Sequence, residues 1–413
     1  MNKTFKVAII GGGSSGLFCA IELLKGDNSL FGSDVLLLEA TDRVGKKLVA
    51  SGNGQGNLSN TQFSCGNFYG DKGFIKASLS DFSIKDLIDF YSSLGIYLIE
   101  DEEGRLYPKS MNASSVLDNI RSFLINKNLN IRTNEKVISI KYKNKFEITT
   151  SNGIFYAENC VFAFGGKSGK QFGTDGSSYQ LAEKFSHKIT RLYPSLVQLK
   201  TETEFLKGLK GIKERVKITA LDKDKSIKKT EGDILFTDYG VSGDAVFKIS
   251  SSVVDLVNPI LSIEFLPSVS LEDLTEIIKN KQKLDFIPQN ELLNGLVNKR
   301  TGYNLTRYAE NTSPQELAKA MKDFRIRVVG TSGFDQSQVT KGGVDTNDVN
   351  PFTFKSKLQK DLYLVGELLN VDGECGGYNL SFAYHSGVKC AKAIKDKISG
   401  EKLWNLELFI MNI

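Results

Sequence analysis

The stretch KVAIIGGGSSG, Lys6–Gly16, decides the fold expected for the first part of the chain. Residues 7–10 are apolar and mostly β-branched, which favours a buried strand, and residues 17–24 continue as an apolar helix. Between them lie three glycines at G-x-G-x-x-G spacing: Gly11, Gly13 and Gly16. Such glycines permit a tight turn, a close approach of backbone to phosphate, and close packing of helix on strand. The helix N-terminus adds free N–H groups for an anion, so the stretch predicts a dinucleotide-binding turn.

A second apolar strand, residues 34–38, ends in Glu39. An acidic residue at this place accepts hydrogen bonds from ribose hydroxyls in dinucleotide-binding domains. The strand–turn–helix–strand–Glu order makes the glycine spacing more specific than it is alone. The competing interpretation is a glycine-rich turn that binds no ligand.

The segment Thr41–Asn60 carries four glycines and three basic residues in twenty positions. A surface loop does not need so much glycine, whereas a loop that lies against a flat ring and two phosphates does. Lys46 and Lys47 are candidates to balance phosphate charge, or they are solvated loop charges.

A second nucleotide-type turn follows near the other end of the chain. The apolar residues 362–365 predict a strand, and Gly366-Glu367 follows it directly. Residues 372–379 hold three more glycines and lead into a helix. A carboxylate after a strand and a glycine-rich helix start suit a ribitol hydroxyl and an electron-rich ring edge. Two such turns, one near each end, suit a long ligand such as FAD better than NAD alone.

The composition is that of a soluble globular protein. The 413 residues are enough for two or three domains. The net charge of +5 favours an anionic partner, and a nucleotide cofactor alone would account for it. Five scattered cysteines without a C-x-x-C pair argue against a zinc site or redox dithiol and for a reducing compartment. No metal site is expected. There is no signal-peptide pattern and no apolar run of 18 residues, so we expect a cytoplasmic protein without membrane contact.

The pattern of expected strands and helices changes in the middle of the chain. We expect residues 1–192 and 341–413 to form one discontinuous FAD-binding domain. Residues 193–340 would be an insertion that covers the substrate, β-rich at 193–268 and 323–340 and helical at 269–322. Three helices are expected in the helical part, at 270–284, 289–298 and 313–321.

Several longer motifs carry a resemblance to a known family. They are IIGGGSSG, GKKLVASGNGQGNLSN, FGTDGSSY, LFTDYGVSGDAVFKIS, VTKGGVDTN and LYLVGELLNVDGECGGYNLSFAYHSG. In this order and over nearly the whole chain they resemble the bacterial three-domain FAD flavoproteins of the BaiN/RdsA type, related to aminoacetone oxidase. The resemblance implies an α/β fold: a Rossmann-like FAD-binding domain of the two-dinucleotide-binding type, with an inserted β-barrel-like domain and a small helical domain.

The resemblance also implies a set of FAD contacts, carried over motif by motif. They are Gly11, Gly13, Ser14, Ser15, Gly16, Glu39, Lys47, Ser51, Gly52, Asn53, Val137, Gly165, Gly366, Glu367, Gly377, Tyr378 and Asn379.

The chain departs from the family pattern at several positions. Gln55 and Gly56 stand where the family has Arg and Cys, and Phe164 stands for a Thr. Asp238 replaces a His and Asp244 a Pro. These departures indicate a divergent branch, and the resemblance does not carry over an activity that depends on the missing Arg, Cys or His.

Candidates for an acid, a base or a nucleophile are few. His385 follows the second glycine turn by about two helical turns, and Tyr378 and Cys375 lie beside that turn. Each has a plainer interpretation: a core or surface histidine, a packed tyrosine, and an inert thiol whose pKa nothing lowers. The sequence therefore identifies no catalytic residue.

Flavin chemistry leaves three classes of function open. The first is an FAD-dependent oxidoreductase that exchanges hydride between flavin N5 and a small or medium organic substrate, with NADH or NADPH as the donor. Enone reduction and amine oxidation with peroxide release both belong here. The second is reduction of a ribosomal RNA uridine to dihydrouridine, and the lysine-rich stretches 207–217 and 223–229 are compatible with it. The third is a flavin-bound assembly protein without turnover. Substrate, donor and oligomeric state stay open.

Overall fold

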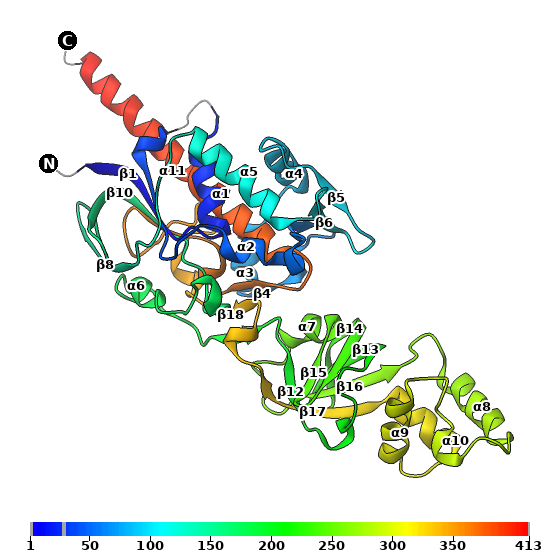
Figure 1. The fold of residues 1–413 in the computed structure, drawn as a ribbon. Coiled ribbons are helices and arrows are strands. Elements are labelled where there is room, and N and C mark those ends of the chain that lie inside the picture. Colours follow the sequence, from blue (N-terminus) through cyan, green and yellow to red (C-terminus); the bar gives the residue numbers. More distant parts are fainter. Residues whose placement is uncertain (1–2, 27–29, 412–413) are drawn as a thin grey trace. The chain divides into compact units, whose positions relative to one another are not determined.

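The computed structural model describes residues 3–26 and 30–411, with side chains up to residue 400. The chain divides into two compact units. One unit is discontinuous and consists of Met1–Leu192 together with Val339–Ile413. The other is Tyr193–Gln338. Figure 1 shows that both ends of the chain, blue and red, belong to the discontinuous unit.

A mixed sheet forms the centre of the discontinuous unit. Its strand order is β7-β2-β1-β10-β9-β8, and β19 also pairs with β10. The pairings among β7, β2, β1, β10 and β19 are parallel, and β8, β9 and β10 form an antiparallel meander. The bounds are β1 Thr4–Ile10, β2 Val35–Leu38, β7 Asn130–Arg132, β8 Val137–Lys143, β9 Lys145–Thr150, β10 Ile154–Phe162 and β19 Leu362–Leu364.

The register of this sheet aligns the carboxyl ends of four parallel strands. Ile10 pairs with Leu38 on one side and with Phe162 on the other, and Phe162 pairs with Leu364. The residues that follow each strand therefore emerge side by side at one edge. Ligands of open parallel sheets bind at this edge, because the turns after the strands meet there.

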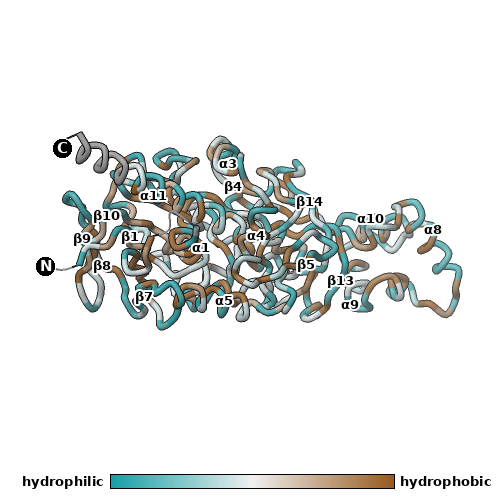
Figure 2. The backbone as a smooth tube through the Cα atoms, turned by 90° about the horizontal axis from the view of Figure 1, so that it is seen from above, coloured by the Kyte–Doolittle hydropathy of each residue, from teal (hydrophilic) through white to brown (hydrophobic). Residues whose placement is uncertain are grey.

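Helices cover the sheet of this unit, and α1 (Ser14–Leu23) packs along α11 (Tyr378–Met411). Figure 2 shows the brown, hydrophobic segments of β1 and α1 inside the unit. A Cβ at Gly387 of α11 would lie 2.5 Å from the Ser15 carbonyl oxygen, so this glycine permits the close crossing. The other helices are α2 Lys46–Val49, α3 Lys72–Ser78, α4 Ile84–Ser92, α5 Ala113–Asn126 and α6 Tyr179–Glu183.

Short strands complete the discontinuous unit. A three-stranded sheet has the order β3-β6-β5, and β20 pairs with β4. Their bounds are β3 Ser59–Asn60, β4 Phe68–Gly70, β5 Leu98–Glu100, β6 Arg105–Pro108, β18 Val339–Lys341 and β20 Val371–Gly373.

The second unit contains a closed antiparallel barrel with the strand order β12-β15-β14-β13-β16-β17. Alternate residues of each strand face a core of its own, which includes Val216, Phe236 and Ile263. Its strands are β11 Tyr193–Ser195, β12 Leu199–Thr201, β13 Lys213–Asp222, β14 Lys225–Thr237, β15 Gly240–Ser242, β16 Ile260–Phe265 and β17 Phe324–Thr331. Its helices are α7 Asp244–Ser250, α8 Leu271–Gln282, α9 Lys299–Tyr308 and α10 Pro314–Lys322.

The prediction of one helix in this unit is wrong. Residues 289–298 form one 3-10 turn and irregular structure, and α9 begins only after Asn298. Gly295 has φ +80, which ends any helix there, and the Asn298 side chain caps α9 by accepting from Arg300 N–H at 3.0 Å. The helices expected at 270–284 and 313–321 are present as α8 and α10, each with its serine cap.

The expected fold class is confirmed: a Rossmann-type domain is interrupted by a closed six-stranded barrel with a small helical part. Among the described residues, no helix combines the length and the apolar character that a membrane span requires.

Candidate dinucleotide-binding site

The first glycine turn has the backbone that the sequence predicts. Gly11 has φ +110, and a Cβ there would lie 2.5 Å from the Ala163 carbonyl oxygen. A Cβ at Gly16 would lie 2.1 Å from the Gly11 carbonyl oxygen, so helix α1 can approach β1 only with glycine there. A Cβ at Gly13 would meet no described atom within 4 Å. The space beside Gly13 is therefore open, at the N-terminal end of α1.

Ser14, Ser15 and Gly16 form the first turn of α1, and their N–H groups have no acceptor within the helix. The first intrahelical bond runs from Leu17 N–H to the Gly13 carbonyl oxygen at 2.9 Å. The free donors and the helix dipole favour negative charge at this end. The turn thus has the donors that a pyrophosphate requires.

Glu39 follows β2 and is fixed by three hydrogen bonds. Its Oε2 accepts from Gly12 N–H at 2.8 Å, and its Oε1 accepts from the backbone N–H and hydroxyl of Thr41, both at 2.8 Å. A carboxylate has about four acceptor positions, so one remains for a ligand hydroxyl. The carboxylate is held against the first glycine turn itself.

The second glycine turn meets the first. Gly366 has φ +73, and a Cβ there would lie 2.5 Å from Ser15 Oγ. The Gly366 N–H donates to Ser386 Oγ of α11 at 3.0 Å, and the preceding Val365 N–H donates to the Phe162 carbonyl oxygen at 3.0 Å. Two turns that are 350 positions apart in the sequence thus form one surface within one compact unit.

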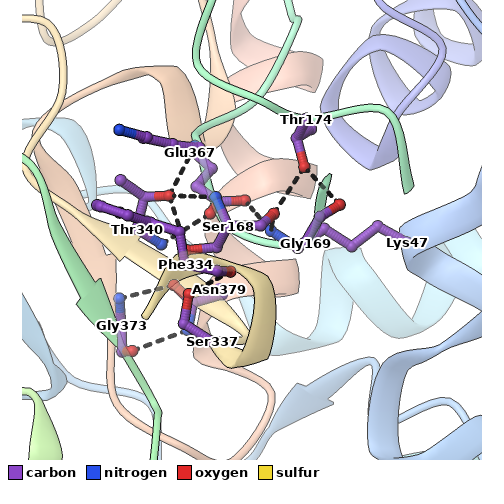
Figure 3. Close-up of polar contacts among 11 residues, drawn as sticks. Lys47, Ser168, Gly169, Thr174, Phe334, Ser337, Thr340, Glu367, Gly373 and Asn379 are labelled. Atoms are coloured by element: carbon purple, nitrogen blue, oxygen red, sulfur yellow. Dashed lines mark hydrogen bonds and ion pairs between the residues drawn. The ribbon is translucent and has the colours of Figure 1, made fainter. Parts of the chain in front are cut away.

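Four residues from four chain segments form a closed ring of contacts near this surface (Figure 3). Lys47 Nζ lies 2.7 Å from Glu367 Oε2, and Glu367 Oε1 accepts from Thr340 N–H at 2.9 Å. Thr340 Oγ1 accepts from Ser168 N–H at 2.9 Å, and the Ser168 carbonyl oxygen accepts from Lys47 Nζ at 3.3 Å. The ring fixes one basic and one acidic residue that the sequence assigned to cofactor binding.

The glycine-rich loop after α2 lies against the start of α11. Gly52 and Asn53 both have left-handed backbone, with φ 55 and φ 54. A Cβ at Gly377 would lie 2.4 Å from the Ser59 carbonyl oxygen, and Asn60 Nδ2 donates to the Gly376 carbonyl oxygen at 3.1 Å. The structure therefore brings residues 59–60 and residues 376–377 together, and the expectation that residues 51–57 and 372–379 flank one ring stays a prediction.

Other expected contacts lie beside these turns. Gly165, with φ +75, follows β10 at the same sheet edge as Gly11. Val137 begins β8, two residues after Glu135, whose N–H donates to the Glu39 carbonyl oxygen at 2.9 Å. Ser51 Oγ donates to the Leu48 carbonyl oxygen at 2.7 Å and so holds its own loop.

The side chain of Asn379 serves the turn that precedes it. Its Oδ1 accepts from Gly373 N–H, and its Nδ2 donates to the Gly373 carbonyl oxygen, each at 2.8 Å (Figure 3). The amide group of Asn379 therefore holds the turn at Gly373 together.

Tyr378 and Cys375 lie at the start of α11, beside the expected ring position. Tyr378 is buried, and its ring packs at 6.2 Å from Phe68 and at 6.4 Å from Phe63. Cys375 is half-buried between Glu374, whose N–H donates to the Asn67 carbonyl oxygen, and Gly376. Both remain candidates by position only.

His385 is held by contacts outside the glycine turns. Its ring is buried, its Nε2 lies 2.6 Å from the Ser78 carbonyl oxygen, and Phe82 packs on it edge-on at 5.5 Å. Burial is the main cause that lowers its pKa to about 4. It lines a cavity of about 210 Å³ whose lining includes none of the expected cofactor contacts. We therefore assign His385 to holding the end of α3.

Three contributors to the site were not found from the sequence. Thr340 and Ser168 belong to the ring with Lys47 and Glu367, and Tyr107 of β6 lies 3.3 Å from a Cβ built at Gly52. Burial raises the pKa of Tyr107. Thr340 lies in the motif VTKGGVDTN, where Gly342 and Gly343, and not the threonine, indicate a nucleotide-type turn.

The positions that depart from the family pattern have plain structural places. Gln55 is exposed, and Phe164 packs at 5.2 Å from Phe162. Asp238 pairs with Lys210 at the surface of the barrel unit, and Asp244 begins α7 and pairs with Lys248 at 2.7 Å.

The residues at the two turns fit a dinucleotide, that is, a pyrophosphate with a nucleoside-type group on each side. The open space at Gly13, the free N–H groups of α1, and the remaining acceptor position on Glu39 suit a pyrophosphate and a ribose. The second turn at Gly366, continuous with the first, extends the surface beyond one nucleotide. The fold and site thus define a dinucleotide-binding flavoprotein of the two-turn type.

Comparison with known proteins gives the particular family. A model described as the HI0933-like protein Rossmann domain matches residues 5–393. The 3-dehydro-bile acid delta(4,6)-reductase of Clostridium scindens is 32% identical over 95% of this chain and 99% of its own length. The ribosomal RNA dihydrouridine synthase of Escherichia coli is 30% identical over 94% and 98%. The chain belongs to the HI0933-like family and is an FAD-dependent oxidoreductase.

Solved structures give a weaker likeness. The 3-ketosteroid-delta4-(5alpha)-dehydrogenase of Rhodococcus jostii is 11% identical, with a TM-score of 0.47 over 95% of this chain and 98% of that chain. A glycine oxidase of Geobacillus kaustophilus is also 11% identical, with a TM-score of 0.40 over 95% of each chain.

Proposed function

We propose that this protein is an FAD-dependent reductase of a small or medium organic molecule with a conjugated carbonyl group, and that NADH or NADPH is its electron donor. The observation that carries the proposal is the junction of the two glycine turns, where Gly366 packs on Ser15 and Glu367 pairs with Lys47. A single turn would suit NAD as well as FAD, whereas the two joined turns suit a longer ligand such as FAD.

We assign the chain's own groups as follows. The N–H groups of Ser14–Gly16 would bind the pyrophosphate, and Glu39 would accept from the ribose at its remaining acceptor position. Lys47 and Glu367 would meet the phosphates and the ribitol chain. The loop at 51–53 and the start of α11 at 377–379 would flank the ring.

FAD would supply hydride transfer at its N5 atom, and the protein would supply position and charge. The N-terminus of α11 carries partial positive charge, which favours added negative charge on a ring placed at that end. Val137 and Gly165 would complete the site beside the first turn.

The substrate class is inferred from the relative named as a 3-dehydro-bile acid reductase, which spans almost the same length. An extended apolar substrate with a conjugated carbonyl is therefore the first class to test.

Reduction of a ribosomal RNA uridine is the second candidate, because two relatives carry that name. The basic residues of β13 do not favour it. Lys213 pairs with Asp233, Arg215 with Glu231 and Lys217 with Glu264, at 2.7, 3.2 and 3.9 Å. Paired cations have less charge available for phosphates, so an RNA surface has weaker support than a small-molecule site.

The test is an anaerobic absorbance titration of the purified protein with NADH and NADPH in turn, followed by an enone-containing 3-oxo steroid. We expect the flavin band to bleach with one nucleotide and to return when the enone is added. The Gly13→Val variant with added free FAD is the matched control, and its band should not bleach.

Other outcomes contradict the proposal in distinct ways. A band that ignores both nucleotides and bleaches with amines, with peroxide released in air, would indicate an oxidase. Return of the band with ribosomal RNA and not with enones would favour the RNA enzyme. A protein that binds no FAD would overturn the assignment of both turns.

A further inference from the structure

Thr340 lies at the point where three segments of the FAD-binding unit meet, and it is fully buried. Its hydroxyl makes three hydrogen bonds: Oγ1 accepts from Lys167 N–H at 2.8 Å and from Ser168 N–H at 2.9 Å, and it lies 3.0 Å from Ser168 Oγ. These bonds use every donor and acceptor position that a hydroxyl has.

The backbone of the same residue holds a site carboxylate. Thr340 N–H donates to Glu367 Oε1 at 2.9 Å, while Glu367 Oε2 pairs with Lys47 (Figure 3). The hydroxyl ties this strand to the segment at 167–168, so it determines where the Thr340 N–H points. It also holds Ser168, whose carbonyl oxygen accepts from Lys47 Nζ at 3.3 Å and from Thr174 Oγ1 at 2.6 Å.

Gly166 shows how closely these segments must pack. A Cβ at Gly166 would lie 2.5 Å from Thr340 Oγ1 and 2.9 Å from Glu367 Oε1. Only glycine leaves room for Thr340 and Glu367 together at this place. The close packing at Gly166 thus places the Thr340 hydroxyl where it accepts from two successive backbone N–H groups, those of Lys167 and Ser168.

We propose that Thr340 is a positioning residue for the cofactor: its hydroxyl holds β18 against residues 167–168, so that the Thr340 N–H fixes the Glu367 carboxylate in the place from which it meets FAD. This inference rests on the proposed function, because it takes Glu367 as a cofactor contact. Thr340 itself is not assigned any contact with FAD or substrate.

The test compares Thr340→Val, which keeps the shape and removes the hydroxyl, with Thr340→Ser, which keeps the hydroxyl. The Kd for FAD is measured by flavin fluorescence on the apoprotein, and thermal unfolding of the apoprotein is measured beside it. We expect Thr340→Val to raise the Kd about tenfold, because the Thr340 N–H that binds Glu367 is no longer held in place. Thr340→Ser should stay within about twofold, on the same free-energy scale.

A double-mutant cycle separates positioning from general destabilisation. If Thr340 acts through Glu367, Thr340→Val should not raise the Kd further in a Glu367→Gln background, although it still lowers the unfolding temperature. Additive effects on the Kd would overturn the inference. Failure of Glu367→Gln alone to weaken FAD would instead contradict the proposed role of Glu367.

Thr340→Val leaves two N–H groups without their acceptor, so a second variant is needed in case it does not fold. Ser168→Ala removes the 3.0 Å contact between the two side chains and leaves the Ser168 N–H in place as a donor to Thr340 Oγ1. We expect a smaller rise in Kd, about threefold, that also disappears in the Glu367→Gln background. A rise that persists there would count against the inference.

Discussion

Lys47 and Glu367 lie 320 positions apart and form an ion pair of 2.7 Å between Nζ and Oε2. Both side chains are about three-quarters buried, at 28% and 20% exposure. Lys47 belongs to α2 near the first glycine turn, and Glu367 directly follows Gly366 of the second. The pair therefore links the two halves of the discontinuous FAD-binding unit.

Replacing Lys47 tests whether this pair serves the cofactor or the fold. We expect Lys47→Met to raise the Kd for FAD about tenfold to hundredfold, since a cation near the phosphates is lost. The free energy of unfolding of the apoprotein should fall by about 1.5–3 kcal/mol, because the mostly buried Glu367 loses its charged partner. Lys46→Met is the control: Lys46 pairs with the exposed Asp42, so FAD affinity should not change. Equal effects of both variants would contradict a specific role.

Gly13→Val should prevent FAD binding and leave the apoprotein folded. A side chain at Gly13 meets no described atom within 4 Å, and φ is −76, so the backbone accepts valine without strain. Its side chain would occupy the space expected for the pyrophosphate. Absorbance at the flavin band and circular dichroism check the two parts. Gly16→Val is the contrast, because its side chain would collide with the Gly11 carbonyl oxygen and destabilise the fold itself. A yellow, fully loaded Gly13→Val protein would refute the site.

Glu39 requires a graded substitution. Glu39→Ala should weaken FAD binding and also loosen the first turn, because Gly12 N–H and Thr41 N–H lose their acceptor, at about 1–2 kcal/mol. Glu39→Gln keeps one acceptor and should affect the Kd for FAD more than stability. Isothermal titration with FAD and denaturant unfolding of the apoprotein measure the two effects. Unchanged affinity in both variants would remove Glu39 from the ribose role.

Stability should depend on pH through His385. Burial lowers the pKa of His385 from its ordinary value of 6.5 to about 4, against the opposing effect of its bond to the Ser78 carbonyl oxygen. The unfolded chain therefore binds a proton that the folded chain does not between these values. The contribution of His385 to the free energy of unfolding should be fully present above pH 6.5. It should be lost as the pH drops toward 4, and the free energy of unfolding should then be lower by about 3 kcal/mol.

The control for this prediction is His385→Gln, whose Nε2 can still donate to the Ser78 carbonyl oxygen. Denaturant unfolding between pH 4 and 7 should show a smaller slope in this variant than in the parent protein. Asp81, at 3.6 Å from His385 Nε2, and Lys389 remain in both proteins, so their contribution is shared. Equal slopes would mean that another group titrates. FAD affinity should be the same in both proteins at pH 7.

Local signals in the sequence were sufficient for much of the fold. The turn at Gly11–Gly16 and the serine caps of α8 and α10 involve residues within a few positions of one another, so spacing and residue type define them. The helix expected at 289–298 is absent because Gly295 takes a left-handed backbone and Asn298 caps the next helix. These two local preferences outweigh the helical spacing of the apolar residues.

The sequence by itself determined the nucleotide turns, because their chemistry requires glycine and free N–H groups at fixed local spacing. The tertiary structure alone decided which residues complete the site. The bond of Thr340 to Ser168, the contact of Gly366 with Ser15 and the burial of His385 against Ser78 join residues more than 150 positions apart. Such contacts depend on strand order and helix packing across the whole unit, and no local pattern encodes them.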